Sequence, residues 1–174
     1  MTKQRILKKT EIFARDLMAN VKESAHDFSH VLRVKKWAEK LAKLEKVDLF
    51  KIQMVALLHD VGRGRENYKK GLAHAEMSAI LVRPFLEQFE EISSEDCNDI
   101  IIAVARHSKG RSKDTWLTQV FQDADRLDGL GLIGIMRATS FYSRMKICNL
   151  PKSFEIKKWN RNAIVHYINQ KIMI

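Results

Sequence analysis

The sequence contains few of the residues that break helices. Only two prolines and seven glycines occur in 174 residues. A protein built from many short strands and tight turns needs more of both, because these residues dominate turns. We therefore expect a mostly helical chain, and its length is sufficient for one domain with a sizeable hydrophobic core.

Cysteine is also scarce, and long apolar runs are missing. The two cysteines, Cys97 and Cys148, form no C-x-x-C pair. Isolated thiols are typical of a reduced cytoplasmic protein rather than a disulfide-linked secreted one. The basic residues 1–10 lead into no apolar segment of a signal peptide, and no apolar run approaches the roughly eighteen residues of a membrane helix. We expect a cytoplasmic protein that does not insert into a membrane.

Acidic residues are outnumbered by basic ones. The chain has 31 Lys and Arg against 21 Asp and Glu, which gives a net charge of +10. Such a balance favours polyanionic partners: nucleic acid, nucleotides or an anionic surface. The excess is spread along the chain and forms no dense basic tail. This distribution favours solvated helix faces and a phosphate-attracting site over a dedicated nucleic-acid surface.

Apolar residues recur at helical spacing along most of the chain. The pattern predicts helices up to about residue 21, over 27–45 and 49–61, from His74, from Ser93, and up to Asp128. Asp48 and Gly62 are suited to cap the two ends of the third predicted helix. The buried stripe of the second consists of His30, Val34, Trp37, Leu41 and Leu44.

No repeat, low-complexity segment or linker divides the chain. We expect a single all-α domain in which residues 1–20 form a covering helix and residues 21–149 form the core around the functional site. Residues 150–174 are expected to form a basic C-terminal tail with a weak helix. The loop over 63–72 is rich in glycine and basic residues and is expected to act as a mobile flap.

Histidines and aspartates gather at the predicted helix ends and buried stripes. Five of the 6 histidines lie there, namely His26, His30, His59, His74 and His107. A single buried histidine is commonly a satisfied core residue. Several that converge with aspartates are different, because buried carboxylates are costly unless a cation compensates them. Imidazole and carboxylate ligands suit Mn, Fe, Co, Ni or Zn better than Mg or Ca.

The order His30, His59-Asp60, Asp125 resembles the HD superfamily of metal-dependent phosphohydrolases. Residues 26–34, with the sequence H-D-F-S-H-V-L-R-V, look like the family's opening motif H-D-x-x-H-x-x-R-V. Three further segments match a compact bacterial branch: His74-Ala75-Glu76, His107-Ser108 and residues 123–128. The resemblance covers roughly residues 20–145 and implies a single-domain helical bundle with a metal site in its centre.

The resemblance also implies which residues hold the metal. One divalent ion would be bound by His30, His59, Asp60 and Asp125. Asp125 is preferred to Asp123 because the family's ligand immediately precedes the Arg-Leu of this motif. Helix register agrees, since Asp125 lies four residues after Phe121 on the predicted buried face.

Further positions match residues that hold the substrate in this family. His74 and His107 match positions that bind phosphate or, in binuclear branches, a second metal; we prefer the phosphate-facing role. Arg63 stands where basic residues often follow H-D-x-G and is expected to contact phosphate, with a solvated loop arginine as the alternative. His26 can orient a ligand, line the entrance or simply begin its helix. Asp128 is the weakest substrate-binding candidate, with a hydrogen bond to the loop as its alternative.

Together these residues imply a hydrolase that uses a metal-activated water on a phosphoryl group. Asp60, His59 and Arg63 are its predicted catalytic residues, and Asp60 can also accept the proton of the water. Branches that act on alarmones or deoxynucleoside monophosphates usually place an acid shortly after the HD pair. Here the sequence after the pair is basic, and the first acid is Glu66. This departure favours a more highly charged nucleotide, cleaved by a pyrophosphohydrolase or phosphatase.

Two alternative functions remain open from the sequence. A nucleic-acid phosphodiesterase would use the same ligands and would explain the net charge of +10. It should bind DNA or RNA with a steep salt dependence. A non-catalytic nucleotide- or nucleic-acid-binding module is the other alternative, and it is disfavoured because every ligand position is filled.

Overall fold

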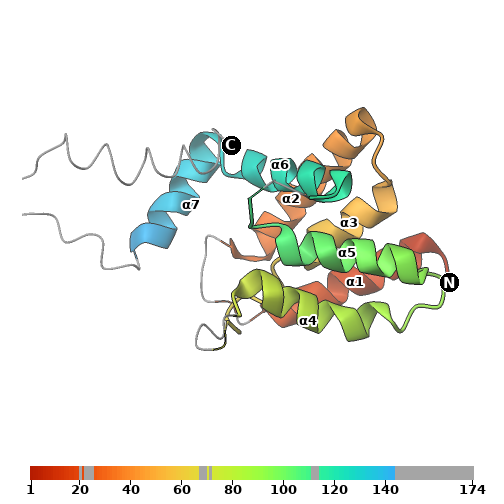
Figure 1. Cartoon of the computed structure of the whole chain (residues 1–174). Helices are drawn as coiled ribbons and strands as arrows, with labels where there is room; N and C mark the ends of the chain where they lie inside the picture. The colour runs from red at the N-terminus through yellow and green to blue at the C-terminus, as the bar shows by residue number, and fades with distance from the viewer. Residues whose placement is uncertain (20, 22–25, 67–69, 71, 111–113, 144–174) are drawn as a thin grey trace, which may run out of the picture.

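A computed structural model describes residues 1–19, 21, 26–66, 70, 72–110 and 114–143 (Figure 1). Over these described residues the regular structure consists of seven α-helices, which confirms the all-α fold. They are α1 (Lys3–Met18), α2 (Phe28–Glu45), α3 (Leu49–Leu58), α4 (His74–Leu86), α5 (Ser94–Arg106), α6 (Trp116–Asp128) and α7 (Gly131–Ser143). Within these described ranges, every helix is too short or too polar to cross a membrane.

Short polar side chains fix where most of the helices begin. Each accepts a hydrogen bond from the backbone N–H three residues further on, at Thr2, Asp27, Asp48, Ser93 and Thr115. A cap of this kind contributes about 1 kcal/mol, because it satisfies a donor that the helix itself cannot. The predicted starts at Asp48 and Ser93 are confirmed.

Helix α3 is the centre of the fold. Its side chains from Ile52 to Leu58 are almost all fully buried, and the helix packs against α1, α2, α5 and α6. A helix that is apolar on every side must be surrounded in this way. Its C-terminal end, His59-Asp60, therefore lies in the interior, where α2, α5 and α6 can each bring side chains to it.

The buried face of α2 differs from the predicted stripe. His30 and Val34 are buried as predicted, but the next buried positions are Ala38 and Ala42, while Trp37 and Leu44 are exposed. The prediction for Trp37 and Leu44 was wrong because it followed the largest apolar residues. The small alanines continue the i, i+4 spacing and let α2 pack closely on α3 and α6.

Gly62 is not the helix cap that the sequence predicted. Helix α3 ends at Leu58, and the chain turns through residues 59–64. A Cβ atom on Gly62 would lie 2.4 Å from the carbonyl oxygen of His74 and 2.4 Å from the backbone nitrogen of Ser78. The N–H of Gly62 also donates to Ser78 Oγ over 2.8 Å. The glycine is therefore required for close contact with α4, and this contact brings His74 to the end of α3.

Some predictions concern residues outside the described ranges. The flap over 63–72 lies partly outside them, because residues 67–69 and 71 are not described. The tail over 150–174 and Cys148 lie entirely outside them. The first predicted helix corresponds to α1, which packs on α3 and α2.

Substituting Gly62 tests the close contact between α3 and α4. We expect Gly62→Ala to lower the free energy of unfolding by about 1–3 kcal/mol, because the new methyl group overlaps two backbone atoms. Gly110→Ala is the matched control, since a Cβ there meets nothing within 4 Å. Chemical denaturation measures both, and equal midpoints for the two variants would contradict the close approach.

Candidate metal centre

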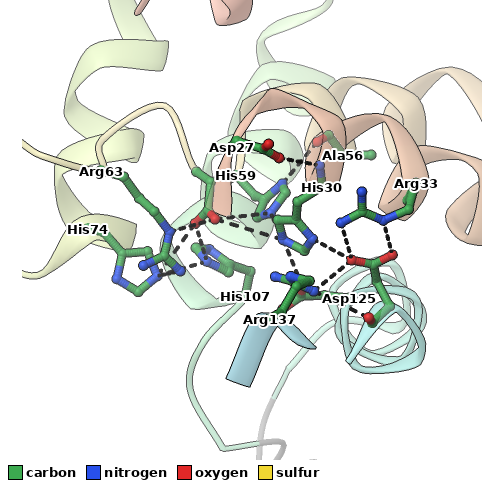
Figure 2. Close-up of polar contacts among 12 residues, drawn as sticks. Asp27, His30, Arg33, Ala56, His59, Arg63, His74, His107, Asp125 and Arg137 are labelled. Carbon is green, nitrogen blue, oxygen red and sulfur yellow. Dashed lines mark hydrogen bonds and ion pairs between the residues drawn. The ribbon is translucent and has the colours of Figure 1, made fainter. Parts of the chain in front are cut away.

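Five helix ends bring polar side chains to one point in the interior (Figure 2). His30 lies in the first turn of α2, and His59-Asp60 directly follows α3. His74 is the first residue of α4, and His107 caps the end of α5. The last turns of α6 carry Asp125 and Asp128. Among these residues, His30, His59, Asp60, His107 and Asp128 are buried.

Three of the imidazole rings are oriented by a hydrogen bond from Nδ1 to an acceptor oxygen. His30 Nδ1 donates to Asp128 Oδ2 over 2.8 Å. The rings of His59 and His107 donate to the backbone oxygens of Ala56 and Val104, over 2.9 and 2.7 Å. Because carbonyl and carboxylate oxygens can only accept, Nδ1 carries the proton. In the neutral ring, each Nε2 then presents its lone pair to the interior.

These Nε2 atoms meet two carboxylates. His30 Nε2 lies 3.4 Å from His59 Nε2 and 3.4 Å from Asp125 Oδ1. Asp60 Oδ2 lies 3.6 Å from His59 Nε2 and 3.9 Å from His30 Nε2. Ligand atoms about 2.1 Å from one ion lie at most about 4.2 Å apart, so the spacings among His30, His59 and Asp60 fit a single cation. Asp125 adjoins this group through His30 Nε2. The nitrogen and oxygen donors suit Mn, Fe, Co, Ni or Zn.

Asp60 also faces a second group of nitrogen atoms. Its Oδ1 lies 3.6 Å from His74 Nε2 and 3.5 Å from His107 Nε2, and these two nitrogens are 3.1 Å apart. Oδ1 is buried and has no hydrogen-bond partner among the described residues. A buried acceptor of this kind is costly unless a donor or a cation satisfies it. Asp60 therefore belongs to two groups of side chains that could each hold an ion. One contains His30 and His59, and the other contains His74 and His107.

Arg63 balances the charge of Asp60. Its Nε donates to Asp60 Oδ2 over 2.6 Å, and its Nη2 lies 3.5 Å from His74 Nε2. Burial by itself would raise the pKa of Asp60, but Arg63 and His59 hold that pKa well below its usual range. The carboxylate is therefore ionised at neutral pH, as a metal ligand must be.

The histidines differ in their affinity for protons. Burial lowers the pKa of His59 to about 4. Burial and the nearby Arg63 lower the pKa of His74 to about 3. His30 behaves in the opposite way: burial would lower its pKa, but hydrogen bonds to Asp125 and Asp128 outweigh this and raise it. At neutral pH, His59 and His74 are thus neutral and have a free lone pair.

The sequence-predicted residues take distinct places around Asp60. His30 Nε2 and His59 Nε2 lie nearest Oδ2, and His74 and His107 lie nearest Oδ1. Arg63 donates to Oδ2 and lies beside His74 (Figure 2). Asp125 adjoins His30. Asp123 is half-exposed beside Arg126, whereas Asp125 Oδ1 lies 3.4 Å from His30 Nε2. His26 packs edge-on against His30, with ring centroids 5.6 Å apart.

Two arginines near the site were given no role from the sequence. Arg33 Nε donates to Asp128 Oδ1 over 2.8 Å, and Arg137 Nη1 donates to Asp128 Oδ2 over 2.6 Å. Arg33 follows His30 by three residues and so shares its helix face, a signal that could have identified it. Arg137 had no such signal, because its position depends on how α7 turns back toward α6.

Sequence comparisons place this centre in a known family. A model of the HD domain matches residues 27–130, more than half of the chain. Protein YpgQ of Bacillus subtilis is 33% identical over 124 residues, which cover 68% of this chain and 58% of YpgQ. Protein L803 of Acanthamoeba polyphaga mimivirus is 26% identical over 152 residues, 79% of this chain and 62% of L803. The chain thus spans less than two thirds of either relative.

Solved structures share the fold as well. A predicted HD superfamily hydrolase from an uncultured Thermotogales bacterium is 31% identical with a TM-score of 0.66, over 77% of this chain and 74% of its own. The structure of Bacillus subtilis YpgQ in complex with ADP is 27% identical, with a TM-score of 0.66. The match covers 84% of this chain and 70% of the YpgQ chain. The matched region contains His30, His59, Asp60 and Asp125. The chain therefore belongs to the HD-domain family.

Proposed function

We propose that this chain is a divalent-metal-dependent phosphohydrolase that acts on a nucleotide. The proposal rests on one observation. The Nε2 atoms of His30 and His59 lie close to each other and to the carboxylates of Asp60 and Asp125. These four residues would hold one ion of Mn, Fe, Co, Ni or Zn. When bound, such an ion activates water and neutralises charge on phosphoryl oxygens.

The chain's own residues would orient the substrate from one side. His74 and Arg63 have side chains 17% and 15% exposed, whereas those of His30 and His59 are 1% exposed. A phosphorylated substrate would therefore approach past α4. The Arg63 guanidinium and the ring nitrogens of His74 and His107 would contact phosphoryl oxygens as negative charge builds up on them. Asp60 Oδ1, ionised and without a hydrogen-bond partner among the described residues, would accept a proton from water.

A nucleotide is the substrate class that the surroundings favour. Arg63 and Arg65 lie within five residues of the His59-Asp60 pair, and the net charge of the chain is +10. Highly charged polyphosphates gain most from such cationic surroundings. The similar protein YpgQ has been solved in complex with ADP. We therefore propose a nucleoside polyphosphate as substrate, cleaved by pyrophosphohydrolase or phosphatase chemistry.

A second ion is the alternative role for His74 and His107. Together with Asp60 they form a group whose ligand atoms lie within 4.8 Å of one another. In that arrangement Asp60 would bridge two ions and the two histidines would not contact phosphate directly. Metal titration distinguishes the two arrangements, because one predicts a single site per chain and the other predicts two.

Substituting Asp60 tests the proposed reaction. We expect Asp60→Asn to lower hydrolysis by about a hundredfold or more, because the charge that holds the ion is lost. The assay screens nucleotides and generic phosphate esters with Mn, Co, Ni and Mg. Asp123→Asn is the matched control, since this half-exposed carboxylate on the same helix as Asp125 should be dispensable. Equal activity of Asp60→Asn and the intact chain, both folded, would contradict the proposal.

The pKa of His30 predicts how metal binding depends on pH. This pKa is raised above its ordinary 6.5, and a proton on Nε2 would occupy the lone pair that the ion needs. Metal affinity should therefore fall as the pH drops through that pKa, by about tenfold per pH unit below it. His59, with its pKa of about 4, should add no further loss until much lower pH.

Calorimetry of Mn²⁺ binding between pH 5.5 and 8, repeated in buffers of different ionisation enthalpy, counts the protons released on binding. We expect about one proton per ion below the pKa of His30. A constant affinity with no proton release across this range would contradict the role of His30 as a ligand.

A further inference from the structure

Asp128 lies behind the proposed metal centre, and its carboxylate is fully engaged. Oδ2 accepts from His30 Nδ1 over 2.8 Å, and Oδ1 accepts from Arg33 Nε over 2.8 Å. Arg33 Nη2 and Arg137 Nη1 reach Oδ2 over 3.2 and 2.6 Å. The side chain is only 3% exposed. A carboxylate that is buried and holds four protein donors has little capacity left for a substrate.

We propose that Asp128 is a positioning residue for the metal ligand His30, and that Arg33 and Arg137 hold its carboxylate in place. The inference rests on the proposed function, because it concerns a ligand of the proposed ion. It also assigns Asp128 a different role from the substrate contact expected from the sequence. A carboxylate bound to the far nitrogen of a metal-ligating imidazole fixes the orientation of the ring and strengthens it as a ligand.

His30 depends on this support more than the other buried rings do. His59 and His107 donate to carbonyl oxygens three residues earlier in their own helices. Their orientation is set as soon as the local backbone is formed. The acceptor of His30 lies 98 residues away, on α6. Its ring is therefore oriented only when α2 and α6 are packed together and Asp128 is in its correct rotamer.

Arg33 fixes the plane of the Asp128 carboxylate. Its Nε and Nη2 approach the two oxygens as a fork, which sets direction as well as charge. Arg33 is itself held, because its Nη1 donates to Ser29 Oγ over 2.9 Å. Ser29 Oγ in turn donates to Asp27 Oδ1 over 2.6 Å, and Asp27 caps α2. The start of α2 and the orientation of its metal ligand thus belong to one network.

Arg137 adds a contact from α7. Its Nη1 donates to Asp128 Oδ2 and also approaches the backbone oxygen of Asp128 over 3.3 Å. Helix α7 lies beside the end of α6 (Figure 1). A Cβ on Gly134 would lie 2.0 Å from the Gly129 oxygen, so only glycine permits this approach. Gly131, with a φ of +67°, makes the preceding turn. These glycines place Arg137 over Asp128.

The apolar residues in the first turns of α7 contribute little to holding it there. Leu132, Ile135 and Met136 are 73%, 64% and 63% exposed. Arg137, by contrast, points inward, with a side chain 13% exposed. The position of α7 is therefore linked to the metal centre through Arg137, Asp128 and His30. Loss of Arg137 should weaken metal binding even though Arg137 would not itself contact the ion.

The test measures Mn²⁺ affinity by calorimetry, which does not depend on turnover. We expect Asp128→Asn to weaken Mn²⁺ binding by about tenfold to a hundredfold, and Arg137→Met by about threefold to tenfold. Met136→Ala, the exposed neighbour on α7, should match the intact chain. Thermal denaturation without metal establishes that each variant is folded. If Asp128→Asn does not fold, Arg137→Met decides the question, because it retains the carboxylate.

The outcomes separate this inference from the proposed function. Folded variants that bind Mn²⁺ as tightly as the intact chain would overturn the positioning role and leave the proposed function standing. Unchanged Mn²⁺ affinity with a raised KM would identify Asp128 as a substrate contact and also overturn it. An intact chain that binds neither Mn²⁺ nor Fe²⁺, Co²⁺, Ni²⁺ or Zn²⁺ would overturn both. Weaker Mn²⁺ binding in Asp128→Asn and Arg137→Met, with Met136→Ala unchanged, supports the proposal.

Discussion

The burial of the Asp60 carboxylate is the constraint on which the rest of the site depends. An isolated charge in the interior costs several kcal/mol or more, and here it follows the most buried helix of the fold. Arg63 stabilises Oδ2 directly. Oδ1 has no hydrogen-bond partner among the described residues and faces His74 and His107. The centre thus combines a fixed negative charge with nitrogen lone pairs, which is the environment that a divalent ion stabilises.

The same constraint links the site to the packing of the helices. The proposed ligands come from α2, the end of α3 and α6, and each of these elements packs on the other two. An ion held by them would act as a cross-link between these helices and would add its binding free energy to the stability of the fold. The α4 side, where Gly62 permits close contact, is left for the groups that would receive the substrate.

Residues whose places are set by local spacing could be predicted from the sequence. His30 follows from a helical stripe, and His59-Asp60 follows from the end of an apolar helix. The preference for Asp125 over Asp123 needed helix register and the family motif together. Features set by the distance between helices could not be predicted, because spacing along the chain does not report it. Three features are of this kind. Ala38, not Trp37, lies on the buried face of α2, Gly62 contacts α4, and Arg137 donates to Asp128.

The central claim is that one buried centre binds a divalent ion through His30, His59, Asp60 and Asp125. Anomalous diffraction from crystals grown with Mn²⁺ tests this claim most directly, because it locates the ion independently of any reaction. The account predicts a strong peak about 2.0–2.3 Å from the Nε2 atoms of His30 and His59 and from oxygens of Asp60 and Asp125. Peaks confined to surface carboxylates, or no peak between α2, α3 and α6, would contradict it.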